Sequence, residues 1–80
     1  MTPTRESRAA EGITVLRKLR EVGVEDTNPG TKTIKDAIRT WIEDGVPCTI
    51  EKISFGRLDR VGTLVLTRSG KASLTLKVSR

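Results

Sequence analysis

The amino-acid sequence predicts an α+β domain in which two N-terminal helices pack on one face of a three-stranded antiparallel β-meander (ααβββ). Up to Ile42, apolar residues recur every three or four positions, as they do on a helix with one buried side. After Pro47, apolar and polar residues alternate instead, which is the period of a β-strand. The chain has 80 residues and shows no internal repeat or linker, so residues 1–80 are expected to form one domain.

The first helix is expected over about residues 5–22. Its buried side is predicted to consist of four apolar residues at helical spacing: Ile13, Leu16, Leu19 and Val22. Gly23 follows them and suits the end of a helix. Gly12 indicates a break or weak point in this stretch, because glycine destabilises a helix interior. Residues 1–10 are polar, and we expect them to be flexible.

The second helix has the clearest pattern in the chain. Five apolar residues follow the spacing of a single buried face: Ile34, Ala37, Ile38, Trp41 and Ile42. Thr33 is expected to be the N-cap, with Asp36 placed to reach back to it. The segment 28–30, Asn-Pro-Gly, is predicted to form a turn before the helix. Gly45 suits a left-handed C-cap, and Pro47 prevents the helix from continuing.

Three strands are predicted after Pro47, over about residues 48–55, 61–67 and 72–78. In the first strand, Ile50, Ile53 and Phe55 do not keep one parity, which predicts either a β-bulge near Lys52 or a change of face. Residues 68–71, Arg-Ser-Gly-Lys, are typical of a tight hairpin turn. The strands are expected to present these apolar residues to the helices: Ile53, Phe55, Leu64, Leu66, Leu74 and Leu76.

The composition argues against an enzyme, a cofactor site and a metal site. With no His, no Tyr and a single Cys, the chain lacks the residues of Ser-His-Asp and Cys-His nucleophiles and of Cys/His zinc sites. The adjacent carboxylates Glu25-Asp26 and Glu43-Asp44 are interpreted as solvated ends, because neighbouring residues on a helix point apart. Cys48 forms no internal disulfide and is interpreted as a small core residue rather than a reactive thiol.

The same features predict where the protein works. A lone cysteine fits a reducing, cytoplasmic location. No apolar run approaches the roughly 18 residues that a membrane span needs, and the first residues lack the apolar segment of a signal peptide. We therefore expect a protein that does not bind a membrane.

The net charge of +5 is confined to the last 30 residues. Residues 1–50 hold eight Lys/Arg and eight Asp/Glu, whereas residues 51–80 hold seven Lys/Arg and two Asp/Glu, a difference of +5. A one-sided basic surface indicates a polyanionic partner, most often nucleic acid. The alternative is an ordinary surplus of surface cations that keeps a small domain soluble, and composition leaves both open.

Seven basic residues are candidate phosphate contacts for duplex DNA: Lys32, Lys35, Arg39, Arg57, Arg60, Arg68 and Lys71. The first three share the exposed side of the second helix, and the other four flank the two hairpin turns. A helix followed by a basic-tipped hairpin resembles the winged helix-turn-helix plan, which implies a helix in the major groove and a hairpin on the backbone. The succession from Trp41 to Cys48 is similar to that of small phage excisionases and MerR-type domains, which implies a phage or mobile-element regulator.

A protein–protein interaction module is the alternative, such as a phage-encoded inhibitor or a small subunit of a larger assembly. The last strand is a candidate open edge, through which the chain would form a homodimer or pair with another protein. Asp36, Glu43 and Asp44 lie near the proposed reading face of the second helix and would repel phosphates. That helix also has no Asn or Gln to read base edges, so the sequence leaves both functions open.

Overall fold

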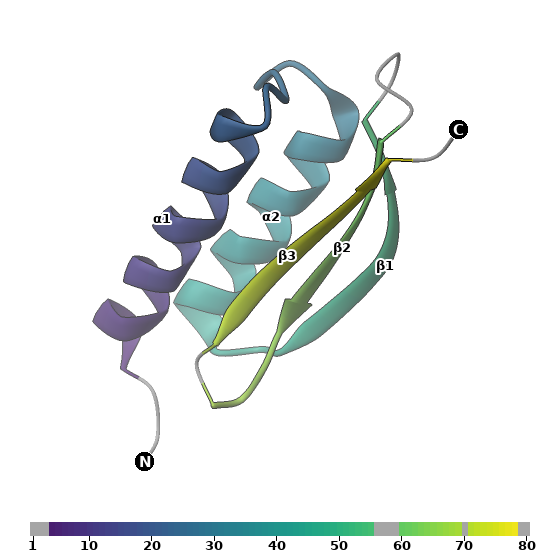
Figure 1. The fold of residues 1–80 in the computed structure, drawn as a ribbon. Coiled ribbons are helices and arrows are strands. Elements are labelled where there is room, and N and C mark those ends of the chain that lie inside the picture. The colour runs from purple at the N-terminus through teal and green to yellow at the C-terminus, as the bar shows by residue number, and fades with distance from the viewer. Residues whose placement is uncertain (1–3, 56–59, 70, 79–80) are drawn as a thin grey trace.

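The structure is a computed structural model that describes residues 4–55, 60–69 and 71–78. Helices α1 (Arg5–Glu21) and α2 (Pro29–Asp44) precede strands β1 (Cys48–Ser54), β2 (Arg60–Leu66) and β3 (Ala72–Val78). The strands form one antiparallel sheet in the order β1-β2-β3, and both helices lie on the same side of it (Figure 1). The predicted ααβββ arrangement is therefore confirmed.

The two helices run antiparallel and lie side by side against the sheet (Figure 1). They form a helical hairpin, whereas the helices of a helix-turn-helix unit cross at a steep angle. The order of the elements and the β2–β3 hairpin agree with the winged-helix resemblance, but the packing of the helix pair does not. Helix α2 is consequently held along the sheet as part of a continuous helical layer.

Helix α2 begins at Pro29, before the predicted cap. The N-cap is Asn28, whose side-chain oxygen accepts a hydrogen bond from the Gly30 N–H at 2.9 Å. Pro29 occupies the first turn, where the missing N–H is not needed. The Thr33 hydroxyl instead donates to the Pro29 carbonyl at 3.1 Å, one turn back within the helix. The predictions of a Thr33 cap and of a separate turn at residues 28–30 are therefore wrong, whereas the left-handed Gly45 cap, with φ of 67°, is confirmed.

Helix α1 runs without interruption through Gly12, which is buried against α2. A Cβ atom added at Gly12 would lie 2.7 Å from Ile38 Cγ2 and 3.1 Å from Ile42 Cδ1. Glycine at this position thus allows the two helices to approach closely, and the predicted break is absent. Ile13, which was expected on the buried side, is 57 % exposed because Gly12 takes the contact position.

The start of α1 is held in place by two kinds of hydrogen bond. The Thr4 side chain caps the helix and accepts from the Ser7 N–H at 3.1 Å. The Arg8 guanidinium donates to the Ile42 carbonyl through Nε at 3.2 Å and through Nη2 at 2.9 Å. Residues 5–10 are thus helical, as the expected first helix implies, and residues 1–3 of the segment expected to be flexible lie outside the described residues.

The register of β1 on β2 shows the predicted bulge. Ile50 pairs with Leu64 and Ile53 with Gly62, so the register shifts between the two isoleucines. Because of this shift, Ile50 and Ile53 both turn towards the helices and pack on the core. The bulge places Glu51 and Lys52 next to each other, both exposed, at the outer strand of the sheet.

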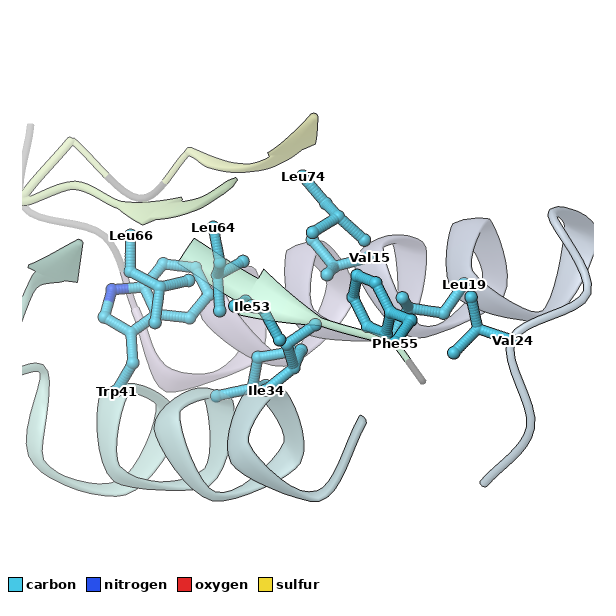
Figure 2. Close-up of a cluster of buried hydrophobic side chains, with 11 residues drawn as sticks. Val15, Leu19, Val24, Ile34, Trp41, Ile53, Phe55, Leu64, Leu66 and Leu74 are labelled. Atoms are coloured by element: carbon cyan, nitrogen blue, oxygen red, sulfur yellow. The ribbon is translucent and has the colours of Figure 1, made fainter. Parts of the chain in front are cut away.

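The core lies between the helical hairpin and the sheet (Figure 2). It consists of eleven buried apolar residues: Val15, Leu19, Val24, Ile34, Ile38, Trp41, Ile53, Phe55, Leu64, Leu66 and Leu74. Of the residues expected on buried faces, five are only partly buried: Leu16, Val22, Ala37, Ile42 and Leu76. Trp41 and Phe55, the two aromatic residues of the chain, are each 1 % exposed. Neither aromatic ring is therefore available at the surface.

We predict that Asn28→Ala destabilises the protein by about 1 kcal/mol, because it removes the N-cap acceptor of α2. Thr33→Ala removes a hydroxyl that bonds only within the helix and is the matched control. Urea denaturation followed by circular dichroism measures both changes. Equal effects of the two substitutions would contradict the assignment of Asn28 as the N-cap of α2.

We predict that Gly30→Ala destabilises the protein by about 2 kcal/mol. The added Cβ would lie 2.5 Å from the Ser54 carbonyl oxygen and 2.8 Å from Ile53 Cγ2, so the backbone of β1 has to move. The gain in helix propensity, about 1 kcal/mol, is too small to offset this overlap. Thermal unfolding compared with Thr40→Ala, an exposed site on α2, measures the difference. A stabilised Gly30→Ala variant would show that the close approach is not required.

Candidate nucleic-acid interface

The structure divides the six described candidate phosphate contacts between two layers. Lys32, Lys35 and Arg39 lie on α2, in the helical layer. Arg60 and the pair Arg68 and Lys71 belong to the sheet layer. Arg57 lies outside the described residues. The candidates on α2 and those on the strands are therefore separate groups and are considered in turn.

The charge of the described residues differs sharply between the two layers. The helical layer, residues 5–44, holds eight Lys/Arg and eight Asp/Glu, so its net charge is zero. The sheet layer, residues 48–55, 60–69 and 71–78, holds five Lys/Arg and one Asp/Glu, a net charge of +4. The basic excess that the sequence showed in the last 30 residues is thus a property of the sheet layer.

The cations of α2 are accompanied by carboxylates. Lys35 Nζ lies 3.3 Å from Asp26 Oδ1, an ion pair between α2 and the loop before it. Asp36 and Glu43 are exposed on the same helix as Lys32 and Arg39. This mixed surface does not concentrate positive potential, and phosphates near it would meet carboxylates as well as ammonium groups.

Arg60 has a structural contact. Its guanidinium Nη1 donates to the carbonyl of Val22, which is the C-cap residue of α1, and the side chain is partly buried. A carbonyl at the end of a helix has no partner within the helix, so this bond supplies one from β2. Arg60 therefore joins the last turn of α1 to the first residue of the central strand, a contact across 38 positions of sequence.

Arg68 and Lys71 are exposed at the tip of the β2–β3 hairpin. The tip is closed by Thr67, whose N–H and hydroxyl both bond to the Lys71 carbonyl, at 3.2 Å and 3.0 Å. The Thr67 and Ser69 hydroxyl oxygens are 2.8 Å apart. These bonds join Thr67 to Lys71 across the base of the hairpin, next to the two exposed cations.

One side of the sheet is not covered by the helices (Figure 1). Alternation along each strand places on it a set of mainly short or β-branched side chains, here called the open sheet face: Thr49, Glu51, Ser54, Val61, Thr63, Val65, Thr67, Ser73, Thr75 and Lys77. The register aligns Thr49, Val65 and Ser73 in one row across the three strands. The face is therefore rich in hydroxyl groups, with Lys77 near one end and the basic hairpin tip at the other.

Two exposed lysines of the sheet layer were not among the sequence candidates. Lys52 lies in the β-bulge of β1, and Lys77 lies on the open sheet face. The alternation of Lys77 with the inward-facing Leu76 indicated that Lys77 lies on the exposed side of its strand. Because no other basic residue lies next to it in the sequence, it was not recognised as part of a basic cluster. The three-dimensional register groups these lysines with the hairpin cations in one layer.

Both edges of the sheet carry features that oppose pairing with another strand. On the β3 edge, Lys18 Nζ of α1 donates to the Leu74 carbonyl at 2.7 Å. On the β1 edge, the register is broken by the bulge, where the charged pair Glu51 and Lys52 is exposed. Bulges, charges and covering elements are the usual means by which proteins prevent edge pairing. The predicted strand-to-strand contact through β3 is therefore less favoured than contact through the open sheet face.

The other polar groups have ordinary structural roles. Arg5 bonds to Glu43 at 2.7 Å and lowers the pKa of that carboxyl, which keeps it ionised. Cys48 is half-buried, and burial raises the pKa of its thiol, so the nucleophilic thiolate is disfavoured. Within residues 4–55, 60–69 and 71–78, no three His, Cys, Asp or Glu side chains are grouped to hold a metal ion.

We predict that Arg60→Gln destabilises the protein by about 1–2 kcal/mol, because it removes a charged donor from the partly buried Val22 carbonyl. Arg68→Gln, which removes an exposed arginine of the same layer, is expected to change stability by less than about 0.5 kcal/mol. Chemical denaturation of the two variants makes the comparison. A neutral Arg60→Gln would mean that this side chain is free for another role.

The helices of the described part are too short and too polar to cross a lipid bilayer. Comparison of the chain with protein-family models, with curated proteins and with solved structures finds no match.

Proposed function

We propose that this protein is a non-catalytic nucleic-acid-binding protein that holds duplex DNA against its open sheet face and the tip of its β2–β3 hairpin. The observation that supports the proposal is the separation of charge between the layers. The helical layer is neutral, whereas the described residues of the sheet layer carry a net charge of +4, or +3 without Arg60, which is bonded to the end of α1. The side of the sheet away from the helices is covered by no described element (Figure 1). Such an arrangement attracts a polyanion to one side of the molecule.

The spacing of the cations suits a DNA backbone. Lys71 and Lys77 are six positions apart on extended chain, which corresponds to about 20 Å. At 3.4 Å per base pair, this length matches about six base pairs of duplex. Between the two ends, the Thr and Ser hydroxyl groups of the open sheet face can donate to phosphate oxygens. The phosphate backbone of the DNA would therefore meet hydrogen-bond donors along the whole length of β3.

The described residues favour duplex over single-stranded nucleic acid. Binding of single strands relies on exposed aromatic rings on which bases stack, and both Trp41 and Phe55 are buried. The open sheet face also lacks Asn, Gln and Arg, the residues that form bidentate contacts with base edges. We therefore propose contacts mainly with phosphates and weak preference for sequence, as in a structural or regulatory protein of a reducing, DNA-containing compartment.

Helix α2, which the sequence suggested as the DNA-binding helix, lies outside the proposed interface. Lys32, Lys35 and Arg39 remain outside the proposed interface, because they belong to the neutral layer and share their helix with carboxylates. Arg60 is also left out, since it bonds to the end of α1. The four cations that remain are Lys52, Arg68, Lys71 and Lys77.

We predict salt-dependent binding to a fluorescein-labelled duplex of mixed sequence, measured by fluorescence anisotropy. Four phosphate contacts give a slope of log K against log salt of about −3.6, so affinity falls roughly a hundredfold between 50 and 200 mM salt. Arg68→Ala with Lys71→Ala should reduce the slope by about 2.

The matched control is Lys32→Ala with Arg39→Ala, which removes two cations from the helical layer and should leave the slope unchanged. Absence of binding at 50 mM salt would refute the proposed function. A slope that depends on the helical pair but not on the hairpin pair would move the interface to α2.

A further inference from the structure

A shallow hollow lies between α1 and α2. It is lined by Leu16 from α1 and by Ile38 and Ile42 from α2, with Lys35, Arg39 and Glu43 also around it, and its volume is about 280 Å³. Leu16 and Ile42 are only partly buried by the core. The bottom of this interhelix hollow is therefore apolar, and its border is charged.

Exposed apolar surface continues from the hollow along α1. Ile13 precedes Leu16 by three positions, which makes the two side chains neighbours on the helix. Ile13 is 57 % exposed, and within the described residues only Val46 is a comparably exposed large apolar residue. An exposed isoleucine next to an apolar hollow is typical of a contact surface.

Some of the charged side chains around this surface form ion pairs, and others form none among the described residues. Glu43 is held by Arg5 at 2.7 Å, and Lys35 pairs with Asp26 at 3.3 Å. Arg39 is exposed on the border and, in the described part of the chain, forms no ion pair.

Helix α1 adds two more arginines to this side. Arg20 follows Leu16 by four positions and Arg17 follows Ile13 by four, so both lie near the same side of α1. Both are exposed, and neither is in an ion pair among residues 4–55, 60–69 and 71–78. Together with Arg39 they place three exposed arginines around the hollow, and each can pair with a carboxylate of a partner.

We propose that the interhelix hollow is a docking site for an amphipathic helix of a partner protein, with apolar residues on one side and Asp or Glu on both flanks. Two neighbouring helices form a groove into which the side chains of a third helix pack. The apolar bottom takes the apolar side of the partner, and Arg17, Arg20 and Arg39 take its carboxylates.

A second copy of this chain is a poorer occupant. In a two-fold dimer the same surface meets itself, so the arginines around one hollow would face those around the other. Glu43 is the one acidic residue that lines the hollow, and Arg5 already neutralises it. Charge complementarity therefore selects an acidic partner.

The site is independent of the proposed DNA interface. The hollow lies between the helices, whereas the open sheet face belongs to the other layer. A partner helix and a duplex would therefore bind at the same time, and the protein would connect an acidic protein to DNA.

The test uses a monomeric, lactam-stapled peptide of about 15 residues, with Leu at i, i+3, i+4 and i+7 and Glu at the flanking positions. Isothermal titration calorimetry with the full chain should detect binding below about 200 µM. The same peptide with Lys in place of Glu should bind at least about tenfold more weakly.

The variants separate the hollow from the rest of the surface. Ile13→Ser and Arg39→Glu should each weaken peptide binding about tenfold. Val46→Ser, the matched control for an exposed apolar residue, and Arg68→Glu, the control for an exposed arginine, should leave it unchanged. Circular dichroism melts check that each variant folds.

Three results would overturn the proposal: no binding of the Glu peptide at about 200 µM, equal binding of the Lys peptide, or equal effects of Ile13→Ser and Val46→Ser. Sedimentation that shows a dimer of the native chain, lost in Ile13→Ser, would assign the hollow to a second copy instead. The Ile13→Ser variant should bind duplex DNA as tightly as the native chain. Failure of the peptide-docking proposal can therefore be distinguished from failure of the DNA-binding proposal.

Discussion

The burial of α2 against the sheet is the interaction on which the rest of the structure depends. Ile34, Ile38 and Trp41 are almost completely removed from solvent, and Trp41 points from α2 towards Leu66 of the facing strand (Figure 2). Burial of large apolar side chains is the main favourable contribution to folding. A chain of 80 residues has little further apolar area to use, so this contact determines which side of the sheet is covered.

The choice of covered side also determines what the uncovered side can bind. Both aromatic residues are used in the core, and the open sheet face has hydroxyl and β-branched side chains instead. The same fold thus separates a neutral layer with an apolar hollow from a basic layer whose outer face is rich in hydroxyl groups. These are chemically different surfaces, and each suits a different class of macromolecule.

Much of the fold could be predicted because its signals are local. The helical spacing around Trp41 and the alternation from Ala72 onwards reflect which side chains face the core, and the change of parity between Ile50 and Ile53 indicated the bulge. The start of α2 could not be resolved in this way. An Asn-Pro-Gly segment suits a turn and a capped helix start equally, because in both the Asn side chain accepts from a backbone N–H two positions on.

The candidate site was less predictable, because its contacts are long-range. Nothing near Arg60 in the sequence indicates that its partner is the Val22 carbonyl, and nothing near Gly12 indicates the close approach of Ile38. Helix propensity alone makes Gly12 destabilising in α1, whereas the absence of a side chain at this position allows α1 and α2 to pack closely. The confinement of basic charge to the last 30 residues was visible in the sequence, but the fold was needed to show that these residues form a layer separate from the neutral helices.

The bond from Lys18 to the Leu74 carbonyl has a consequence for solubility. Through this bond, α1 protects the outer edge of β3. A local opening of α1 would expose backbone groups of β3 that can pair with the strand of another molecule. The stability of the first helix therefore also determines how well the outer edge of β3 is protected from pairing with another strand.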